Sequence, residues 1–255
     1  MEIKNIVITG ASSGIGASLS EYYACTGITL GLISLNKERL ETVASMCRDS
    51  GADVHTYVAD VTNRQLMEQC AADFCKHTAS VDLVIANAGI RIEEDKDFAE
   101  NAVPEKLINT NYLGAINTFV PFISVMKKQK QGNLAVISSI AAFRGTPNSG
   151  AYSASKAAIN LWTESLRLRL YPYNINVCTL CVGFVQTAMT ADLTFNLPGI
   201  ISAEKAAKKI ALAIKRRKRT ATFPWQSKWI WMVFRILPGR LYDRLILLAK
   251  SKHPK

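Results

Sequence analysis

Apolar runs alternate with amphipathic segments along most of the chain. Each short run rich in Val, Ile and Leu precedes a stretch whose apolar residues recur every three to four positions, the spacing of one helix face. Strands that are apolar at every position are buried on both faces, as in a parallel sheet covered by helices. The pattern predicts strands at residues 6–9, 28–34, 54–58, 82–86, 133–138, 174–181 and 220–223. It predicts helices at residues 13–24, 37–49, 63–77, 152–171 and 202–218.

This alternation predicts an α/β protein with a single doubly wound, Rossmann-type parallel sheet and helices on both faces. The 255 residues would also allow two domains, but one α/β domain of this size is common, and no repeat or linker divides the chain. We therefore expect one core domain over residues 1–223. Residues 224–255 form a basic, amphipathic C-terminal extension that is not an independent domain.

The charge is distributed unevenly between these two parts. The formal net charge is +11, and residues 201–255 hold 15 of the 31 Lys and Arg residues but only two acids. The preceding 200 residues are nearly neutral, with 16 bases and 18 acids. A neutral core with a basic, interacting tail would have this distribution.

The composition is typical of a folded intracellular protein. Apolar residues make up 49% of the chain and charged residues 20%, which excludes a disordered protein. The six cysteines form no regular framework, and no basic-then-apolar leader precedes the first strand. We therefore expect reduced thiols and a cytoplasmic location.

The first predicted strand ends in a glycine-rich turn, with Gly10, Gly14 and Gly16 before and within the start of a helix. These glycines allow a tight turn and a close backbone approach, and the helix N-terminus offers free N–H groups to a pyrophosphate. A turn without a ligand can carry the same glycines. The spacing G-x-x-x-G-x-G also differs from the general dinucleotide fingerprint G-x-G-x-x-G.

A second group of residues suits proton transfer. Tyr152 and Lys156 lie four positions apart in a predicted helix and therefore share one face. A nearby ammonium lowers the pKa of a phenol from about 10 toward neutrality, as a general acid requires. Ser139, at the end of a strand, could donate a hydrogen bond to a carbonyl oxygen that Tyr152 protonates. An isolated Y-x-x-x-K also occurs on ordinary helices, so this pair alone leaves both interpretations open.

Taken together, these motifs resemble the short-chain dehydrogenase/reductase family over about residues 3–223. The matching positions, in the family's order and spacing, are Thr9 to Gly16, Asn87-Ala88-Gly89, Asn111, Ser139, Tyr152 and Lys156. Ser139 lies 13 positions before Tyr152 and fits the family's serine better than Ser138 does. The resemblance implies an NAD(P)-binding catalytic domain that transfers a hydride between a nicotinamide cofactor and a carbonyl or alcohol substrate.

The resemblance also implies a role for each matched residue. In the catalytic set, Tyr152 would donate the proton and Ser139 would polarise the substrate carbonyl. Lys156 would hold the nicotinamide ribose and lower the tyrosine pKa, and Asn111 would position a water in a proton relay. Asp60 would contact the adenine. The cofactor-binding residues would be Gly10, Ser12, Ser13, Gly14, Ile15, Gly16, Asp60, Val61, Asn87, Ala88, Gly89, Tyr152, Lys156 and Thr187.

The choice between NADP and NAD depends on the end of the second strand. An acid there would bind the ribose hydroxyls of NAD, and a following arginine would pair with the additional phosphate of NADP. This chain has Ser34 and Leu35 instead. The missing carboxylate favours NADP slightly over NAD. No metal is expected, because the three histidines are scattered and no cluster has zinc-like spacing. Cys178-x-x-Cys181 is interpreted as two core residues of a buried strand.

The segment after the sixth strand is apolar and suggests an apolar or lipid-like substrate. A loop that only packs on the core would explain it equally well. The residues expected to face the substrate are Phe143, Asn148, Phe184, Met189 and the segment from Leu193 to Ile200.

The C-terminal extension holds three of the four tryptophans among bases and apolar residues, and Leu241, Leu245 and Leu248 share one face of an amphipathic stretch. Its longest apolar run, residues 229–234, is far below the ~20 residues that span a bilayer. Tryptophans mixed with bases suit a peripheral contact with anionic lipid. A lid over the cleft or an oligomer interface is an equal alternative, and the family resemblance implies a homodimer or a homotetramer.

Two other function classes are weaker. A non-catalytic dinucleotide-binding regulatory or membrane-surface scaffold protein would not need the serine, tyrosine, lysine and asparagine set. The basic run at residues 215–219 ends a predicted helix, where cations meet the negative dipole end, and no aromatic residues interleave with it. We therefore expect no nucleic-acid partner.

Overall fold

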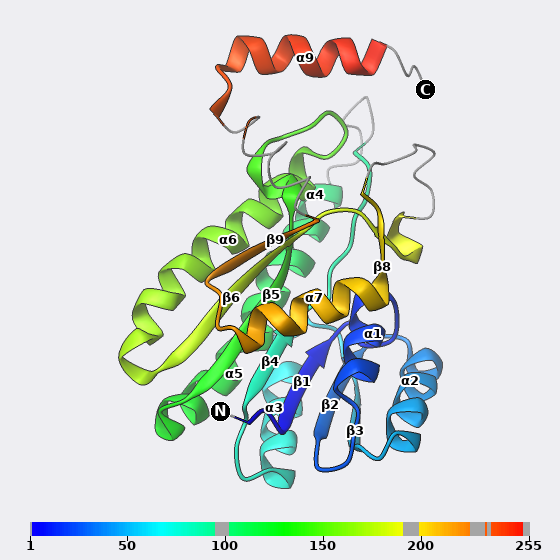
Figure 1. Ribbon diagram of the computed structural model, residues 1–255, viewed down its shortest axis with the longest axis vertical. Coiled ribbons are helices and arrows are strands. Elements are labelled where there is room, and N and C mark those ends of the chain that lie inside the picture. The colour runs from blue at the N-terminus through cyan, green and yellow to red at the C-terminus, as the bar shows by residue number, and fades with distance from the viewer. Residues whose placement is uncertain (1, 95–101, 191–198, 225–232, 234–235, 252–255) are drawn as a thin grey trace.

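The computed structural model describes residues 2–94, 102–190, 199–224, 233 and 236–251. In this part of the chain, seven parallel strands form one sheet in the order β3-β2-β1-β4-β5-β6-β9 (Figure 1). A separate two-stranded pair, β7 (Val185–Gln186) with β8 (Ile201–Ser202), lies outside the main sheet. The strands of the main sheet are β1 (Asn5–Thr9), β2 (Thr29–Ser34), β3 (Asp53–Val58), β4 (Leu83–Ala86), β5 (Gly132–Ser139), β6 (Ile175–Val182) and β9 (Thr220–Phe223).

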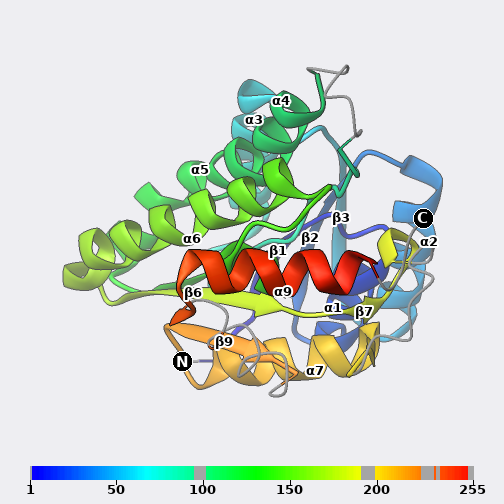
Figure 2. The same ribbon diagram turned by 90° about the horizontal axis from the view of Figure 1, so that it is seen from above.

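Helices cover both faces of the sheet, so the doubly wound architecture predicted from the sequence is confirmed (Figure 2). One face carries α1 (Gly14–Tyr23), α2 (Lys37–Asp49) and α7 (Ala203–Lys215). The other carries α3 (Arg64–His77), α4 (Ala102–Ile108), α5 (Gly114–Gln129) and α6 (Gly150–Leu170). A last helix, α9 (Gly239–Ser251), lies beyond the carboxyl ends of the strands.

The core explains why the central strands carry apolar residues at successive positions. In β1, Ile6 and Ile8 pack into the cluster under α1, α2 and α7, whereas Val7 packs into the cluster under α3, α5 and α6. Cys178 and Cys181 of β6 are fully buried free thiols, and burial raises the pKa of each thiol. They are core residues, as their position in a buried strand predicts.

The predicted strands and helices are present with bounds that shift by a few residues, and the structure adds elements that the pattern did not predict. The helix predicted to reach residue 218 ends at Lys215, because Arg217 adopts a left-handed conformation with φ of 48°. Its N–H donates to Ile214 O, which closes the turn that leads into β9. The pattern did not predict α4, α5, β7, β8 or the π-helical turn Asn109–Leu113 between α4 and α5.

The strand order places two turns side by side. The chain runs from β1 outward to β2 and β3, and then crosses to β4 on the opposite side of β1. The turns that follow β1 and β4 therefore meet at the carboxyl edge of the sheet. Such a topological switch point is where open α/β sheets bind ligands.

Three contacts anchor α9 above this edge. The Tyr242 hydroxyl donates a 2.6 Å hydrogen bond to the carbonyl oxygen of Gly145. The Arg144 guanidinium donates to the carbonyl oxygen of Leu237 at 3.2 Å and lies 4.4 Å from the centre of the Tyr242 ring. Within the described ranges, no helix has both the length and the apolar content needed to cross a bilayer.

Gly31 in β2 offers a test of the sheet packing. A Cβ at this position would lie 2.8 Å from Cδ2 of Phe74, a buried ring of α3 that packs on the sheet. We expect Gly31→Ala to lower the free energy of unfolding by about 1–3 kcal/mol through overpacking. Gly145→Ala, where a Cβ meets open space, should change it little. Chemical denaturation of the two variants measures this difference, and equal unfolding free energies would contradict the packing argument.

Candidate active site

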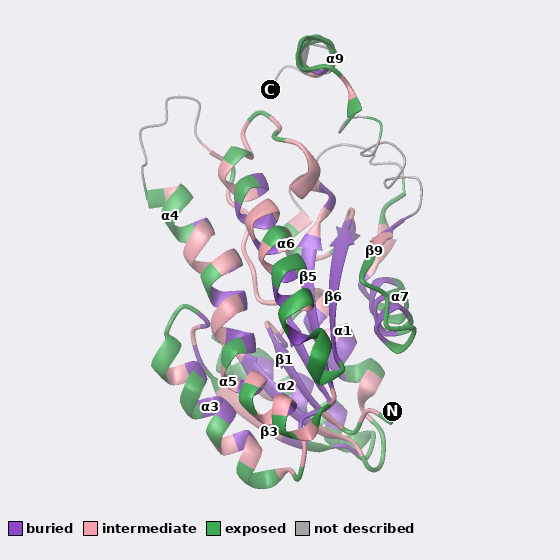
Figure 3. Cartoon of the chain, turned by 90° about the vertical axis from the view of Figure 1, so that its left-hand side faces the viewer, coloured by how far each residue is buried: buried purple, intermediate pink, exposed green. Residues whose placement is uncertain are grey.

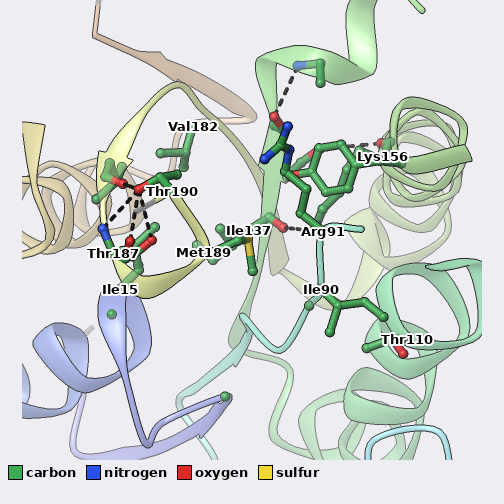
Figure 4. Close-up of a pocket in the computed structure, with 18 of the residues that line it drawn as sticks. Ile15, Ile90, Arg91, Thr110, Ile137, Lys156, Val182, Thr187, Met189 and Thr190 are labelled. Carbon is green, nitrogen blue, oxygen red and sulfur yellow. Dashed lines mark hydrogen bonds between the residues drawn. The ribbon is translucent and has the colours of Figure 1, made fainter. Parts of the chain in front are cut away.

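A cavity of about 1180 Å³ opens at the carboxyl edge of the sheet, over the switch point (Figure 4). Its walls come from the turns after β1, β4, β5 and β6, from α6, and from α9. Every residue predicted to bind cofactor lines it except Gly16, which packs directly beneath the turn. Ser139, Tyr152 and Lys156 of the predicted catalytic set also line it, whereas Asn111 lies behind the wall.

Two turns form the floor of the cavity, and side-chain hydrogen bonds to their backbone hold them together. The Asn87 side chain donates to the carbonyl oxygens of Thr9 and Gly10, at 3.0 and 3.2 Å. The Thr9 hydroxyl accepts hydrogen bonds from the N–H groups of Asn87 and Ala88. Gly10 has a φ of +66°, and a Cβ there would lie 2.8 Å from Nδ2 of Asn87. Only glycine fits this position, and a ligand can approach the backbone closely.

The N-terminus of α1 points its free N–H groups toward this cavity. Its N-cap residue Ser13 makes no side-chain capping hydrogen bond, and the first turn carries no acid. A Cβ on Gly14 would lie 3.0 Å from Cγ2 of Thr187, so the loop after β7 closes against the same turn. Unsatisfied N–H groups and a positive dipole end suit the pyrophosphate of a dinucleotide. The glycine turn therefore fits a nicotinamide cofactor.

The far end of the cavity is lined by Ser34, Leu35, Asp60 and Val61. The hydroxyls of Ser12 and Ser34 are 2.7 Å apart, so Ser34 faces the glycine turn. The carboxylate of Asp60 accepts the N–H of Thr62 at 2.8 Å, which fixes its orientation. This end can hold the adenosine half of the cofactor, with hydroxyls rather than a carboxylate at the end of β2.

Ser139 and Tyr152 meet in the opposite wall. Ser139 accepts the N–H of Ala141 at 3.1 Å, and its hydroxyl lies close enough to the Tyr152 hydroxyl to affect the pKa of the phenol. Ser138 instead turns beneath α6, toward the carbonyl oxygen of Lys156. Burial raises the pKa of Tyr152, while the Ser139 hydroxyl and the Arg91 charge lower it. The net rise differs from the lowering expected from the sequence, because burial disfavours the phenolate more than these neighbours favour it.

Lys156 is buried directly below the cavity. Its Nζ donates a 3.0 Å hydrogen bond to the carbonyl oxygen of Ile137, and the residue is only 5% exposed. Burial lowers the pKa of Lys156 to about 8, against a small opposing effect of Cys181. A Cβ on Gly89 would lie 3.3 Å from the Nζ, so the glycine after β4 leaves the ammonium accessible from the cavity.

Asn111 supports the wall from behind. It lies in the π-helical turn, and its side-chain amide binds both the N–H and the carbonyl oxygen of Ile90, at 2.8 and 2.9 Å. Its Nδ2 also donates to the Ser155 hydroxyl. These contacts join the turn after β4 to α6. A role for Asn111 in a water relay to Lys156 stays a prediction.

Sequence reasoning missed Arg91, which extends beside Ile137 and Lys156 on the opposite side of the cavity from Thr187 (Figure 4). Its guanidinium pairs with Glu93 at 3.1 Å. No local pattern marks it, because only the sheet order brings it to the active site. Ile246 and Leu247 of α9 were also missed as lining residues.

The predicted substrate-facing residues are only partly placed there. Asn148, Phe184 and Met189 line the cavity, whereas Phe143 is not among its lining residues. Of the predicted segment from 193 to 200, residues 193–198 lie outside the described part of the chain. Among the described residues, no three His, Cys, Asp or Glu side chains come together as a metal ion would require.

The buried lysine predicts a pH-dependent cost in stability. Between its ordinary pKa of 10.5 and the lowered value of about 8, the unfolded chain binds a proton that the folded protein does not. The free energy of unfolding should therefore rise with pH across this window, and a cost of about 3 kcal/mol remains below it. A substitution that removes the ammonium would remove this cost. It would also remove the hydrogen bond to the carbonyl oxygen of Ile137, which offsets about 1 kcal/mol of the gain in stability.

We therefore expect Lys156→Met to be about 2 kcal/mol more stable than the wild type near pH 7, with the difference narrowing toward pH 10. Urea unfolding at both pH values measures it, with the exposed Lys128→Met as control. A difference that does not depend on pH would show that the burial of the ammonium is not its cause.

The comparisons with known proteins agree with this site. A family model described as short chain dehydrogenase matches residues 4–197. An uncharacterized oxidoreductase of Myxococcus xanthus is 29% identical over 243 residues, which cover 95% of this chain and 96% of that protein. A fatty acyl-CoA reductase of Acinetobacter baylyi is 31% identical over 223 residues, which cover 86% of this chain and 76% of that protein.

A solved structure shares the fold over nearly the whole chain. It is a short-chain dehydrogenase from Sphingobium yanoikuyae in complex with NADPH, with a TM-score of 0.79 and 23% identity. The match covers 98% of this chain and 94% of that one. The family match, the parallel sheet and the relatives lead to one conclusion: the chain belongs to the short-chain dehydrogenase family and is a nicotinamide-dependent oxidoreductase acting on CH–OH or C=O groups.

Proposed function

We propose that Tyr152 is the proton donor of this oxidoreductase and that its substrate is an apolar carbonyl or alcohol. The observation that carries the proposal is that Ser139 and Tyr152 lie side by side in the wall of one cavity, which the glycine turn also lines. A carbonyl oxygen within reach of both hydroxyls would place its carbon toward the cofactor side of the cavity. This arrangement satisfies the positional requirement of general acid catalysis.

In the direction of reduction, a nicotinamide cofactor held by the glycine turn would supply the hydride for the carbonyl carbon. Ser139 donates a hydrogen bond to the carbonyl oxygen and stabilises the negative charge that develops there. Tyr152 transfers its phenolic proton to the same oxygen, which completes the alcohol. In the reverse direction the phenolate takes this proton back, so a nearby cation favours oxidation.

Arg91 supplies such a charge near the phenol, and Lys156 would donate to the cofactor ribose. Its ammonium is held by the carbonyl oxygen of Ile137 and faces the cavity past Gly89. With a pKa of about 8, the group can release and regain a proton near neutral pH and so help to reprotonate Tyr152.

An apolar substrate is supported by the part of the cavity beyond the glycine turn. Its walls there include Ile90, Phe184, Met189 and Ile246. Such walls stabilise an alkyl chain or ring system by the area they remove from water. One relative is named a fatty acyl-CoA reductase, which supports a lipid-like substrate class.

The proton donor can be tested by Tyr152→Phe. We expect kcat to fall by about 10²–10⁴-fold, because the hydroxyl that protonates the carbonyl oxygen is lost. Binding of NADPH, followed by fluorescence titration, should be unchanged. Tyr171→Phe, at an exposed tyrosine, is the matched control and should keep full activity. Normal turnover by Tyr152→Phe would rule out the proposed role.

We propose NADP as the preferred cofactor over NAD. The end of β2 presents the hydroxyl of Ser34 and no carboxylate, so it would not repel a phosphate on the adenosine ribose. Asn36, Lys37 and Arg39 follow directly and can supply donors and charge. These groups suit an anion better than a neutral ribose.

Ser34→Asp tests this preference. A carboxylate at this position should weaken NADPH binding by about tenfold, the effect of roughly 1.4 kcal/mol of like-charge repulsion, and leave NADH binding intact or improved. Ser34→Asn, which lacks the charge, is the control. Fluorescence titrations of both variants with both cofactors measure it. Tighter binding of NADH than NADPH by the wild type would contradict the proposal.

We also infer a cytoplasmic, peripheral membrane protein that forms a homodimer or a homotetramer. All six cysteines are free thiols, which supports a reducing compartment. Leu161 and Leu168 on α6 are each 68% exposed, which supports subunit association through that helix. The basic, tryptophan-rich extension supports membrane contact, although residues 225–232 lie outside the described part of the chain.

A further inference from the structure

The C-terminal helix α9 has two different apolar faces. Tyr242 and Ile246 lie one turn apart on one side of the helix, and Leu241, Leu245 and Leu248 lie on another. In Figure 3 the helix is seen end on, above the carboxyl edge of the sheet, and is exposed over most of its surface. A helix with an apolar stripe on two sides has two surfaces to cover.

The first face covers the active-site cavity. Tyr242 is 7% exposed, and its hydroxyl is bonded to Gly145, next to the loop that contributes Thr146 to Ser149 to the cavity wall. Ile246 and Leu247 line the cavity itself. Leu247 is nevertheless 63% exposed, so it lies at the border between the cavity and the surroundings. This face therefore forms the rim of the substrate site.

The second face is largely exposed. Leu241 and Leu245 are 47% and 41% exposed, and Leu248 on the same stripe is exposed as well. Arg240 and Arg244 are exposed residues of the same helix, and Asp243 is its one acid. Residues 225–255 hold seven Lys or Arg and this single acid. The outer face thus combines leucines with an excess of positive charge.

We propose that the outer face of α9 docks on an anionic lipid bilayer, and that the cavity takes its apolar substrate from this bilayer past the rim formed by α9. The second part rests on the proposed function, whereas the first does not. Leucines on an amphipathic helix bury their side chains at the headgroup boundary, and neighbouring arginines bind anionic headgroups.

Charge favours a bilayer over a second copy of this chain as the partner. Two copies that met through α9 would bring Arg240 and Arg244 of each close to the bases of the other, and like charges oppose such an interface. Anionic lipid complements the same bases. Each arginine near such a surface adds attraction that salt weakens.

The docked orientation also explains why Ile246 and Leu247 face the cavity. A substrate that leaves the bilayer at α9 would reach apolar side chains at once and would not cross water. The contacts of Arg144 with Leu237 and Tyr242 hold α9 to the loop that contributes Thr146 to Ser149 to the cavity wall. Docking of the helix therefore also orients the mouth of the cavity.

The docking step is tested with the full-length protein and sedimentation of phosphatidylcholine vesicles, with and without phosphatidylserine. We expect the wild type to sediment with the anionic vesicles only, and added salt to release it. Leu241→Glu/Leu245→Glu should bind at least about tenfold more weakly, because two leucines that would become buried in the bilayer are lost. Met46→Glu/Leu212→Glu, with the same charge change at similarly exposed positions on α2 and α7, should bind like the wild type.

Equal sedimentation of the Leu241→Glu/Leu245→Glu variant and the wild type, or no binding of the wild type, would overturn the docking proposal. Size-exclusion chromatography with light scattering distinguishes the other partner. A loss of oligomerisation in this variant, with unchanged vesicle binding, would assign the outer face to a second copy of the chain and overturn the proposal.

The substrate route is tested by turnover of two aldehydes, one short and soluble in water and one long-chain and supplied in the anionic vesicles. The Leu241→Glu/Leu245→Glu variant should reduce the soluble aldehyde at the wild-type rate but the vesicle-borne aldehyde at least about tenfold more slowly. Equal rates on the vesicle-borne aldehyde would overturn the route. If the wild type reduces neither aldehyde yet binds vesicles, the proposed function and the route that rests on it fail and the docking proposal stands.

Discussion

The close contact between the turns after β1 and β4 is the constraint on which the active site depends. The Asn87 amide and the Thr9 hydroxyl tie the two turns together, and the space between them excludes a side chain at Gly10. The cavity floor is therefore backbone, and the N-terminus of α1 is held where a phosphate group can meet its N–H groups. A parallel sheet with this strand order produces such a site because the carboxyl ends of neighbouring strands meet at one edge.

The same edge positions the groups for proton transfer. The end of β5 supplies both the Ser139 hydroxyl beside Tyr152 and the Ile137 carbonyl that holds Lys156. Burial raises the pKa of the phenol and lowers the pKa of the ammonium, so the protein favours the neutral form of both groups. A buried ammonium lowers the free energy of unfolding, and the large apolar core on both faces of the sheet offsets this loss.

The C-terminal helix gives the cavity a boundary that the parallel sheet does not provide. The body of the protein is nearly neutral, whereas the chain beyond residue 200 is strongly basic. The contacts of Arg144 and Tyr242 join these two parts at the mouth of the cavity. Surface recognition and catalysis thus meet at one place, although the residues responsible lie far apart in the sequence.

The sequence by itself determined the elements and the local motifs. Helix α2 (Lys37–Asp49) and strand β9 (Thr220–Phe223) have the predicted bounds, because burial imposes a hydrophobic period that neighbouring residues carry. Tyr152 and Lys156 share one helix face for the same local reason. Only the tertiary structure placed Arg91 beside Tyr152 and brought α9 to the rim of the cavity. It also raised the pKa of Tyr152 through burial. These features depend on which distant segments pack together and how much water they exclude, and no local spacing encodes that.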